Sequence, residues 1–387
     1  MISRKKALIM AILLVFVSVA GTLAFQVTLG NKVIISKNEY EELSKFYKLI
    51  YLKKEIENNY YKKVDEDKLI EGAQKGLFEG IGDPYSVYYD KKEFAKEMED
   101  TKGSYVGVGL LIGPTDEGGI IVVAPFDGSP AAKAGIKSGD MILKVDGSEV
   151  SGKRGGTEKA SSMMRGEPGT PVKLTIKRES NNKIEELDLV RAEIDIKTVK
   201  SEVLENNIGY LRISHFDEKT AKEFEDNLKG LKSKNIKSLI IDLRDNPGGL
   251  VNQSVRIADD LLEKGTVVYT KDRNGKTKYE NSAPGKLIDV PIVVLVNEGT
   301  ASSSEILSGA LRDHNAATLI GTKTFGKGIV QAVIPLRDET GYKITVTQYF
   351  TPKGESIHKK GIKPKIEIED PDAQLKKAIE VLKEKMK

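Results

Sequence analysis

Hydrophobic patterning divides the chain into segments of different periodicity. Apolar residues at helical spacing predict helices over residues 38–100. The Gly82-Asp83-Pro84 sequence predicts a turn, because proline lacks an amide donor and keeps the residue before it out of the helical region. From about 103 to 191, short apolar runs between glycine-rich turns predict a small, mostly β domain. We expect one short helix in it, after Ser129-Pro130.

Beyond residue 206, apolar runs typical of strands alternate with helical patterns. Strands are expected at 208–213, 238–243, 267–270, 291–296 and 317–320, and helices near 217–232, 250–263 and 303–313. Such alternation favours an α/β domain. We expect two closing strands at 328–336 and 342–350 and an amphipathic terminal helix at 373–387.

The N-terminal segment has the properties of a membrane span. The 19 residues from Ala7 to Phe25 are uncharged and mostly apolar, and as a helix they would extend roughly 28 Å, close to the thickness of a bilayer core. Basic residues at 4–6 precede them, which predicts a cytoplasmic N-terminus and an extracytoplasmic body. The alternative is a cleaved signal peptide with its cleavage site after Ser-Val-Ala at 18–20, and the protein would then be secreted.

Composition excludes several classes of function. With 61 basic and 57 acidic residues the net charge is only +4, so no basic surface favours nucleic acid as a partner. The chain has no cysteine, which excludes disulfides, thiolate metal sites and a cysteine nucleophile. A length of 387 residues predicts two or three domains.

Ser302 is the first candidate for chemistry. It follows the apolar run 292–296 and opens a helix, where free backbone N–H groups and the helix dipole can stabilise an oxyanion. This setting suits acyl transfer. The structural alternative is a capping box, in which Ser302 and Glu305 only terminate the helix.

Lys327 is the second candidate, since Gly326 and Gly328 flank it and a lysine in an apolar site can lose its proton near neutral pH. His215, His314 and His358 are the other candidate bases for a serine nucleophile. Residues 321–327 also match the first seven positions of a phosphate-binding loop. That loop needs serine or threonine where this chain has glycine at 328, and a helix rather than a strand should follow.

A third segment, Asp242-Leu243-Arg244-Asp245-Asn246-Pro247-Gly248-Gly249, joins a buried strand to a helix. Paired glycines at such a junction can direct backbone N–H groups into a site, or can serve only as turn residues.

Together these segments resemble the carboxyl-terminal processing proteases, serine proteases with an inserted PDZ domain. The resemblance rests on Gly82–Ser86, Gly107–Leu110, Asp242–Gly249 and the serine and lysine motifs, in that order. It implies Ser302 as nucleophile, Lys327 as general base and Gln331 as the residue that orients the base. It also implies an oxyanion hole formed by the backbone N–H groups of Gly249 and Ser303. No metal or cofactor is implied.

The PDZ resemblance rests on residues 105–112, 128–135, 139–140 and 146–147. Such domains add a peptide to a sheet edge and bind its terminal carboxylate, which implies a carboxylate loop at Val108, Gly109 and Leu110. Arg165 could report peptide binding to the protease, or be a solvated surface arginine. A PDZ domain that only packs on the protease is the structural alternative.

The sequence thus predicts a multidomain α+β protein. Its expected parts are a cytoplasmic tip and membrane anchor (1–30), a helical N-terminal region (31–102), a PDZ domain (103–192), an α/β protease core with a Ser/Lys site (193–370) and a C-terminal helix (371–387). The expected function is a serine endopeptidase that hydrolyses exported or membrane proteins after binding their free C-terminal tail. Helices at both ends and the resemblance favour a homodimer.

Two rival functions remain open. One is a catalytically silent, membrane-tethered PDZ scaffold. The other is a penicillin-binding or lactamase-like acyl enzyme, which expects lysine three residues after the serine, where this chain has Glu305.

Overall fold

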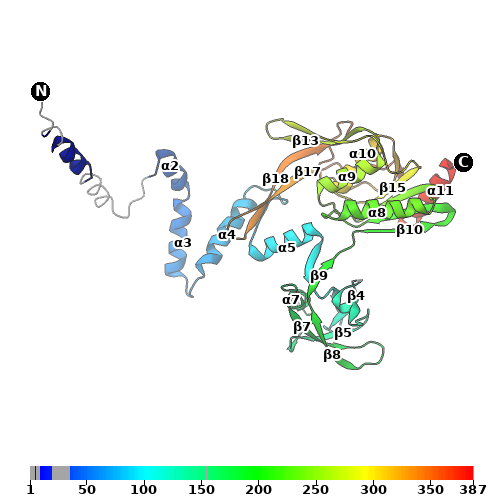
Figure 1. Ribbon diagram of the computed structural model, residues 1–387, viewed down its shortest axis with the longest axis horizontal. Coiled ribbons are helices and arrows are strands. Elements are labelled where there is room, and N and C mark those ends of the chain that lie inside the picture. Colours follow the sequence, from blue (N-terminus) through cyan, green and yellow to red (C-terminus); the bar gives the residue numbers. More distant parts are fainter. Residues whose placement is uncertain (1–4, 6–8, 20–34, 127, 154–155, 387) are drawn as a thin grey trace. The chain divides into compact units, whose positions relative to one another are not determined.

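The computed structural model describes residues 5, 9–19, 35–126, 128–153 and 156–386. It divides into two compact units, Met1–Ala73 and Gln74–Lys387, which we describe separately (Figure 1). The division falls inside the predicted helical region 31–102.

The first unit is helical, as the periodicity predicted. It contains α2 (Lys37–Lys45), α3 (Tyr47–Asn59) and the start of α4 (Glu66–Glu79). Ser36 and Glu39 form a capping box that begins α2. Residues 9–19 are also helical. No helix in the described ranges is long and apolar enough to cross a membrane, and the predicted span Ala7–Phe25 lies partly outside those ranges.

Two elements link α4 to the β-rich domain that follows: β1 (Val87–Tyr89) and α5 (Lys91–Lys102). The predicted turn at 82–84 is confirmed, since α4 ends at Glu79 and residues 81–82 form a turn. Strand β1 was not expected within the predicted helical region. It forms because its residues pair with a distant strand, as described below.

The domain expected over residues 103–192 is mostly β, as predicted. Strands β2 (Ser104–Gly107) and β9 (Ala192–Asp195) pair where the chain enters and leaves it. The main sheet has the order β3-β4-β5-β7-β8, with the bounds Leu110–Pro114, Ile120–Pro125, Met141–Val145, Pro171–Lys177 and Ile184–Val190; β6 (Ser148–Glu149) pairs with β5.

The expected short helix in this domain is confirmed, but it is accompanied by a second helix that was not expected. The helix after Ser129 is present as α6 (Pro130–Lys133), with the Ser129 hydroxyl accepting from the amide of Ala132. A second helix, α7 (Gly156–Met164), packs against β3 and β5. Only Ala160 and Met164 of α7 are buried, so its sequence carries a weak helical pattern.

The C-terminal domain is built on a six-stranded sheet of order β10-β11-β12-β15-β16-β19. Within this sheet, β11, β12, β15, β16 and β19 are parallel, and β10 is antiparallel to β11. This arrangement confirms the α/β prediction. Their bounds are Val199–Leu204, Ile208–Ile213, Ser238–Asp242, Ile292–Val296, Ala317–Gly321 and Ile366–Glu367.

Helices cover both faces of this sheet (Figure 1). Helices α8 (Thr220–Ser233), α9 (Val251–Leu261) and α10 (Ser303–Asp313) share a core with Leu239 and Ile241 of β12. Ile240 belongs to a second core with α11 (Pro371–Lys385). Because both faces are buried, the central strands read as continuous apolar runs.

A second sheet has the order β1-β18-β13-β14, and β17 also pairs with β18. Strands β17 (Ile329–Pro335) and β18 (Gly341–Phe350) are the predicted closing pair. Their register shifts between Val330 and Gln331, where a bulge lets Gln331 pair with Thr345. Strand β13 (Gly265–Asp272) was predicted, but its partner β14 (Thr277–Ser282), which is largely exposed and polar, was not.

Candidate active site

Ser302 lies at a strained strand-to-helix junction between β15 and α10. Its φ of 55° and ψ of −117° are sparsely populated for a residue with a side chain. Two contacts hold it there: its amide donates to Glu305 Oε2 at 2.9 Å, and its carbonyl accepts from the Tyr349 hydroxyl at 3.0 Å. A serine on such a turn presents its side chain at the edge of the sheet, as nucleophiles of hydrolases do.

The capping box considered as the alternative for Ser302 is present. Glu305, however, does more than end a helix. Its fully buried carboxylate also accepts from the Thr324 hydroxyl and from the amides of Gly326, at 2.8 Å, and Lys327, at 2.9 Å. Burial raises the pKa of Glu305, and these hydrogen bonds oppose the increase. The carboxylate therefore joins the backbone of the nucleophile to the backbone of the lysine loop.

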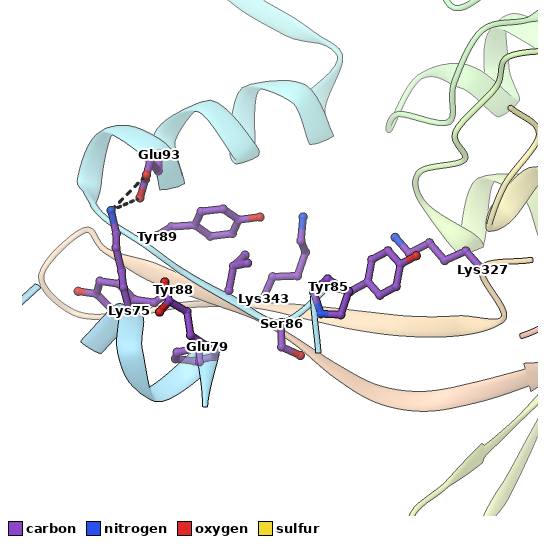
Figure 2. A pocket seen from close by; sticks show the side chains of 12 residues that line it. Lys75, Glu79, Tyr85, Ser86, Tyr88, Tyr89, Glu93, Lys327 and Lys343 are labelled. Atoms are coloured by element: carbon purple, nitrogen blue, oxygen red, sulfur yellow. Dashed lines mark hydrogen bonds and ion pairs between the residues drawn. The ribbon is translucent and has the colours of Figure 1, made fainter. Parts of the chain in front are cut away.

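Lys327 is mostly buried, and burial lowers the pKa of its ammonium group, with a further contribution from the charge of Lys343. Its Nζ lies 4.6 Å from the centre of the Tyr85 ring, and Figure 2 shows the tip of Lys327 facing that ring. Within the described residues, Nζ is not hydrogen-bonded to the Ser302 hydroxyl. The structure thus brings the two backbones together but leaves the two functional groups apart.

A cavity of about 450 Å³ adjoins Lys327. Aromatic and apolar side chains supply much of its wall, and Lys343 projects from β18 into the same region (Figure 2). Lys343 is paired with Glu97 at 2.8 Å. The aromatic lining is Phe78, Tyr85, Tyr88 and Tyr89.

Gln331 lies on β17, four residues after Lys327. Its Nε2 donates to Thr345 Oγ1 of β18 at 3.2 Å. No hydrogen bond joins it to Lys327 in the part of the chain that the structure describes.

The amides of Gly249 and Ser303 lie on adjoining loops. Neither is a donor in any turn, loop or cap hydrogen bond among the described residues. Ser303 Oγ donates to the carbonyl of Gly249 at 2.7 Å, which fixes the two loops together. Free amides at a helix N-terminus are suited to binding a developing negative charge.

Gly248 was given no role of its own in the sequence analysis, yet it packs directly on Ser302. A Cβ on Gly248 would lie 2.7 Å from Cβ of Ser302 and 2.9 Å from the amide nitrogen of Ser303, and its φ is +99°. Only glycine allows this approach. The paired glycines were the available signal, but their distance from Ser302 in sequence concealed the contact.

Asn246 was also missed. Its side chain donates to the carbonyl of Ile213 and accepts from the amide of Gly248, both at 2.9 Å. Its own carbonyl accepts from the amide of Ala301 at 3.0 Å. Asn246 thereby holds the glycine loop against the nucleophile loop. No periodicity or spacing marks such a role.

The other candidate bases do not meet Ser302. His215 lies 3.6 Å from Asp217, His314 bonds to the carbonyl of Thr266, and the backbone of His358 packs near Gly328. The phosphate-loop alternative for 321–327 fails as expected, because strand β17 follows it rather than a helix.

In the PDZ domain, the side chains of Val108 and Leu110 are buried, and Gly109 has a φ of +78°. A Cβ on Gly109 would lie 2.3 Å from Cβ of Ser129. Strand β3, which begins at Leu110, is at the edge of the sheet beside α7. This arrangement leaves an edge to which a peptide strand can be added.

Arg165 follows α7 and is not simply solvated. Its guanidinium group is paired with Glu99 of α5 and lies 4.5 Å from the centre of the Tyr105 ring. It therefore connects the PDZ domain to the helix that precedes it.

Three family models match successive parts of the chain. The N-terminal domain of activating protease CtpB matches residues 24–93, a PDZ domain matches residues 97–189, and peptidase family S41 matches residues 207–368. These matches follow the order of the segments described above.

Individual relatives match over most of the chain. Carboxy-terminal processing protease CtpA of Bacillus subtilis is 40% identical over 363 residues, covering 93% of this chain and 77% of the relative. CtpB of the same organism is 38% identical, covering 86% and 68%. The solved structure of the photosystem II D1 C-terminal processing protease is 29% identical with a TM-score of 0.50, covering 85% of this chain and 89% of that one. The chain belongs to the carboxy-terminal processing proteases, serine-type peptidases of family S41 that carry a PDZ domain.

Proposed function

We propose that Ser302 and Lys327 hydrolyse peptide bonds through an acyl-enzyme. Neutral Lys327 takes the proton of the Ser302 hydroxyl as the oxygen attacks the carbonyl carbon. The same proton then passes to the leaving amine, and water releases the acyl group in a second step. One observation carries this proposal: a single buried carboxylate, Glu305, holds the strained serine and the lysine loop together.

The amides of Gly249 and Ser303 are the proposed oxyanion hole. They are free in the described loops, and Ser303 begins α10, so the helix dipole adds to their effect. Loss of one such donor typically costs roughly 100-fold to 1,000-fold in kcat.

The position of Lys327 over Tyr85 indicates a resting arrangement. In the proposed cycle, its side chain turns away from the Tyr85 ring toward Ser302. A substrate that binds the turned arrangement more tightly would shift the population toward it.

The proposed substrate is an exported or membrane protein with a free, apolar C-terminal tail. The tail would add as a strand to the edge of β3, and the loop of Val108, Gly109 and Leu110 would bind its carboxylate. The aromatic cavity beside Lys327 fits an apolar side chain of the segment to be cleaved.

We further propose that Arg165 transmits tail binding, because its contacts with Glu99 and Tyr105 lie at the boundary of the domain.

For location, we propose that residues 7–25 anchor the protein in a membrane with the catalytic domain outside the cytoplasm. The support is the uncharged run and the basic residues at 4–6. Full-length protein should remain in the membrane fraction after an alkaline wash, and a chain without residues 1–30 should not. Release of both would contradict the anchor.

We also propose a homodimer. The first unit exposes apolar side chains along α2 and α3, including Leu43, Phe46, Leu49 and Ile50, and a second copy could cover them. Light scattering at increasing concentration would show twice the chain mass of 42.5 kDa. A constant monomer mass would contradict this proposal.

The test of the proposed activity is cleavage of an unfolded protein with an apolar C-terminus by the full chain, beside Ser302→Ala and Lys327→Ala. Both substitutions should abolish turnover while the thermal unfolding temperature changes little. Turnover that persists in Ser302→Ala would refute the mechanism. Tight peptide binding without turnover by any variant would favour the silent scaffold.

A further inference from the structure

Asp83, in the turn before β1, is the acceptor of a compact hydrogen-bond cluster. Its Oδ2 accepts from the hydroxyls of Thr345, at 2.6 Å, and Ser86, at 2.7 Å. Its Oδ1 accepts from the amide of Tyr85 at 3.1 Å. The Ser86 hydroxyl accepts in turn from the amide of Thr345 at 3.0 Å. The turn and β18 are therefore held together by side chains as well as by the β1 pairing.

The direction of these hydrogen bonds fixes the orientation of Gln331. An ionised carboxylate can only accept, so the Thr345 hydroxyl must give its single proton to Asp83. The Thr345 oxygen can then only accept from Gln331. Gln331 must present its Nε2 there, as it does at 3.2 Å. Its Oε1 is left as the acceptor for another donor.

The ionised form of Asp83, which this hydrogen-bond pattern requires, is favoured. Burial raises the pKa of Asp83, but the hydrogen bonds from Thr345, Ser86 and the Tyr85 amide, together with the charge of His358, outweigh it and leave the pKa below its usual value. Asp83 is thus a carboxylate at neutral pH.

A second branch from Asp83 leads through Tyr85 toward Lys327. Through the amide of Tyr85, the carboxylate fixes the backbone of the residue whose ring lies 4.6 Å from Lys327 Nζ. Figure 2 shows Tyr85 and Ser86 leaving the turn on opposite sides, with the Tyr85 ring toward Lys327. One branch therefore ends at Gln331, four residues after Lys327, and the other at the ring beside the amine of Lys327.

We infer that Asp83 is a positioning residue for Lys327, acting through Thr345 to turn Gln331 Oε1 toward the amine and through Tyr85 to hold the ring beneath it. This inference rests on the proposed function, in which Lys327 is the base. An ammonium or amine donor is the partner that a free amide oxygen needs, and Lys327 is the titratable donor four residues away on the same loop and strand.

The kinetic test is a double-mutant cycle on the full chain. Asp83→Asn can donate to Thr345, which frees the threonine proton and lets Gln331 rotate. We expect kcat to fall about 10-fold with KM unchanged, which is part of the roughly 100-fold to 10,000-fold that a general base contributes. In a Gln331→Ala background the same substitution should change kcat less than about 2-fold, because the two act as a unit. Effects that multiply would overturn the inference.

Matched variants separate positioning from folding. Thr345→Val removes the hydroxyl and should lower kcat as much as Asp83→Asn does. Thr345→Ser keeps a hydroxyl and should retain most of the wild-type kcat. Asp338 also accepts from a threonine hydroxyl, that of Thr340 at 2.6 Å, but in the turn between β17 and β18. Asp338→Asn should leave kcat unchanged, and a loss there equal to that of Asp83→Asn would count against the inference.

A spectroscopic test does not depend on turnover. The chain has six glutamines, so selective ¹⁵N-glutamine labelling gives six side-chain amide pairs, and Gln331→Ala identifies the pair of Gln331. That pair should shift or broaden in Asp83→Asn. An unchanged pair overturns the inference even if the wild-type chain hydrolyses peptides. A shifted pair without any Ser302-dependent hydrolysis supports the orientation by Asp83 and refutes only the proposed function.

Discussion

Ser302 and Lys327 donate their backbone amides to the same carboxylate oxygen of Glu305, each at 2.9 Å. The two residues are 25 positions apart in sequence, and this shared acceptor fixes the distance between their loops. The arrangement can be tested by changing the acceptor without changing its size.

Glu305→Gln should impair both stability and activity. Wherever its amide group points, an NH₂ faces backbone or hydroxyl donors and leaves at least one buried donor unpaired, at a cost of about 1–3 kcal/mol. We expect a lower unfolding free energy in urea and at least a 100-fold loss of kcat/KM. Glu298→Gln is the control, because that exposed glutamate accepts from the hydroxyl of Thr322, five residues before Lys327. Equal effects of the two substitutions would contradict the bridging role.

Lys343→Met should raise the pH at which the enzyme becomes active. Burial and the charge of Lys343 lower the pKa of Lys327, and the charges of Glu97 and Asp83 oppose them. Removing Lys343 deletes a positive charge and leaves Glu97 unpaired, and both changes favour the charged form of Lys327. The base is active when neutral, so the acid limb of kcat/KM against pH moves to higher pH. Lys278→Met, at an exposed pair with Glu280, should leave the profile in place. A limb that moves to lower pH would refute this assignment.

Gly248→Ala should abolish activity by displacing the nucleophile. The added Cβ would lie 2.7 Å from Ser302 Cβ and from the carbonyl oxygen of Ala301. Overpacking of this kind costs about 1–3 kcal/mol, and the positive φ adds about 1–2 kcal/mol. Gly275→Ala separates the two causes, since it shares a positive φ but has nothing within 4 Å. In Gly275→Ala only the backbone strain is expected. The free energy of unfolding should fall modestly, and cleavage should stay normal.

Arg165→Ala should lower the stimulation of cleavage by a C-terminal peptide while basal cleavage of a short substrate persists. The substitution removes both the ion pair with Glu99 and the contact with Tyr105. Cleavage should be measured against increasing peptide, with peptide affinity determined separately by fluorescence polarisation. Lys159→Ala, at an exposed position on α7, is the matched control. Unchanged stimulation in Arg165→Ala would remove Arg165 from the coupling.

The sequence was most informative where burial is continuous. Strands such as β12 and β15 are buried on both faces, so their apolar runs predicted them nearly to the residue. Helix α7 buries only two side chains and β14 only one, so neither carries a periodic signal. Strand β1 exists because of pairing with β18, a long-range contact that local pattern does not contain.

The candidate site divides in the same way. Motifs at 302 and 327 made Ser302 and Lys327 the candidates, because the chemistry expected of them is tied to residue type and local spacing. Glu305 was interpreted only as a helix cap, since its bonds to Gly326 and Lys327 cross from one loop to another. The roles of Gly248 and Asn246 were missed for the same reason. The conformation of the Lys327 side chain, which in the described residues leaves Nζ without a hydrogen bond to the Ser302 hydroxyl, is not contained in a local motif.

The bulge between Val330 and Gln331 restricts where residues can be inserted or deleted in this pair of strands. A regular ladder continued from Ile329 opposite Gln348 would set Gln331 against Val346, which has no hydrogen-bonding group in its side chain. Thr345 is reached only because β18 is one residue longer than its partner over this stretch. Insertions and deletions should therefore be tolerated at the exposed turn near Asp338 and excluded between Thr345 and Thr347. Relatives that keep Gln331 should differ freely in the length of that turn but keep the spacing from Thr345 to Tyr349.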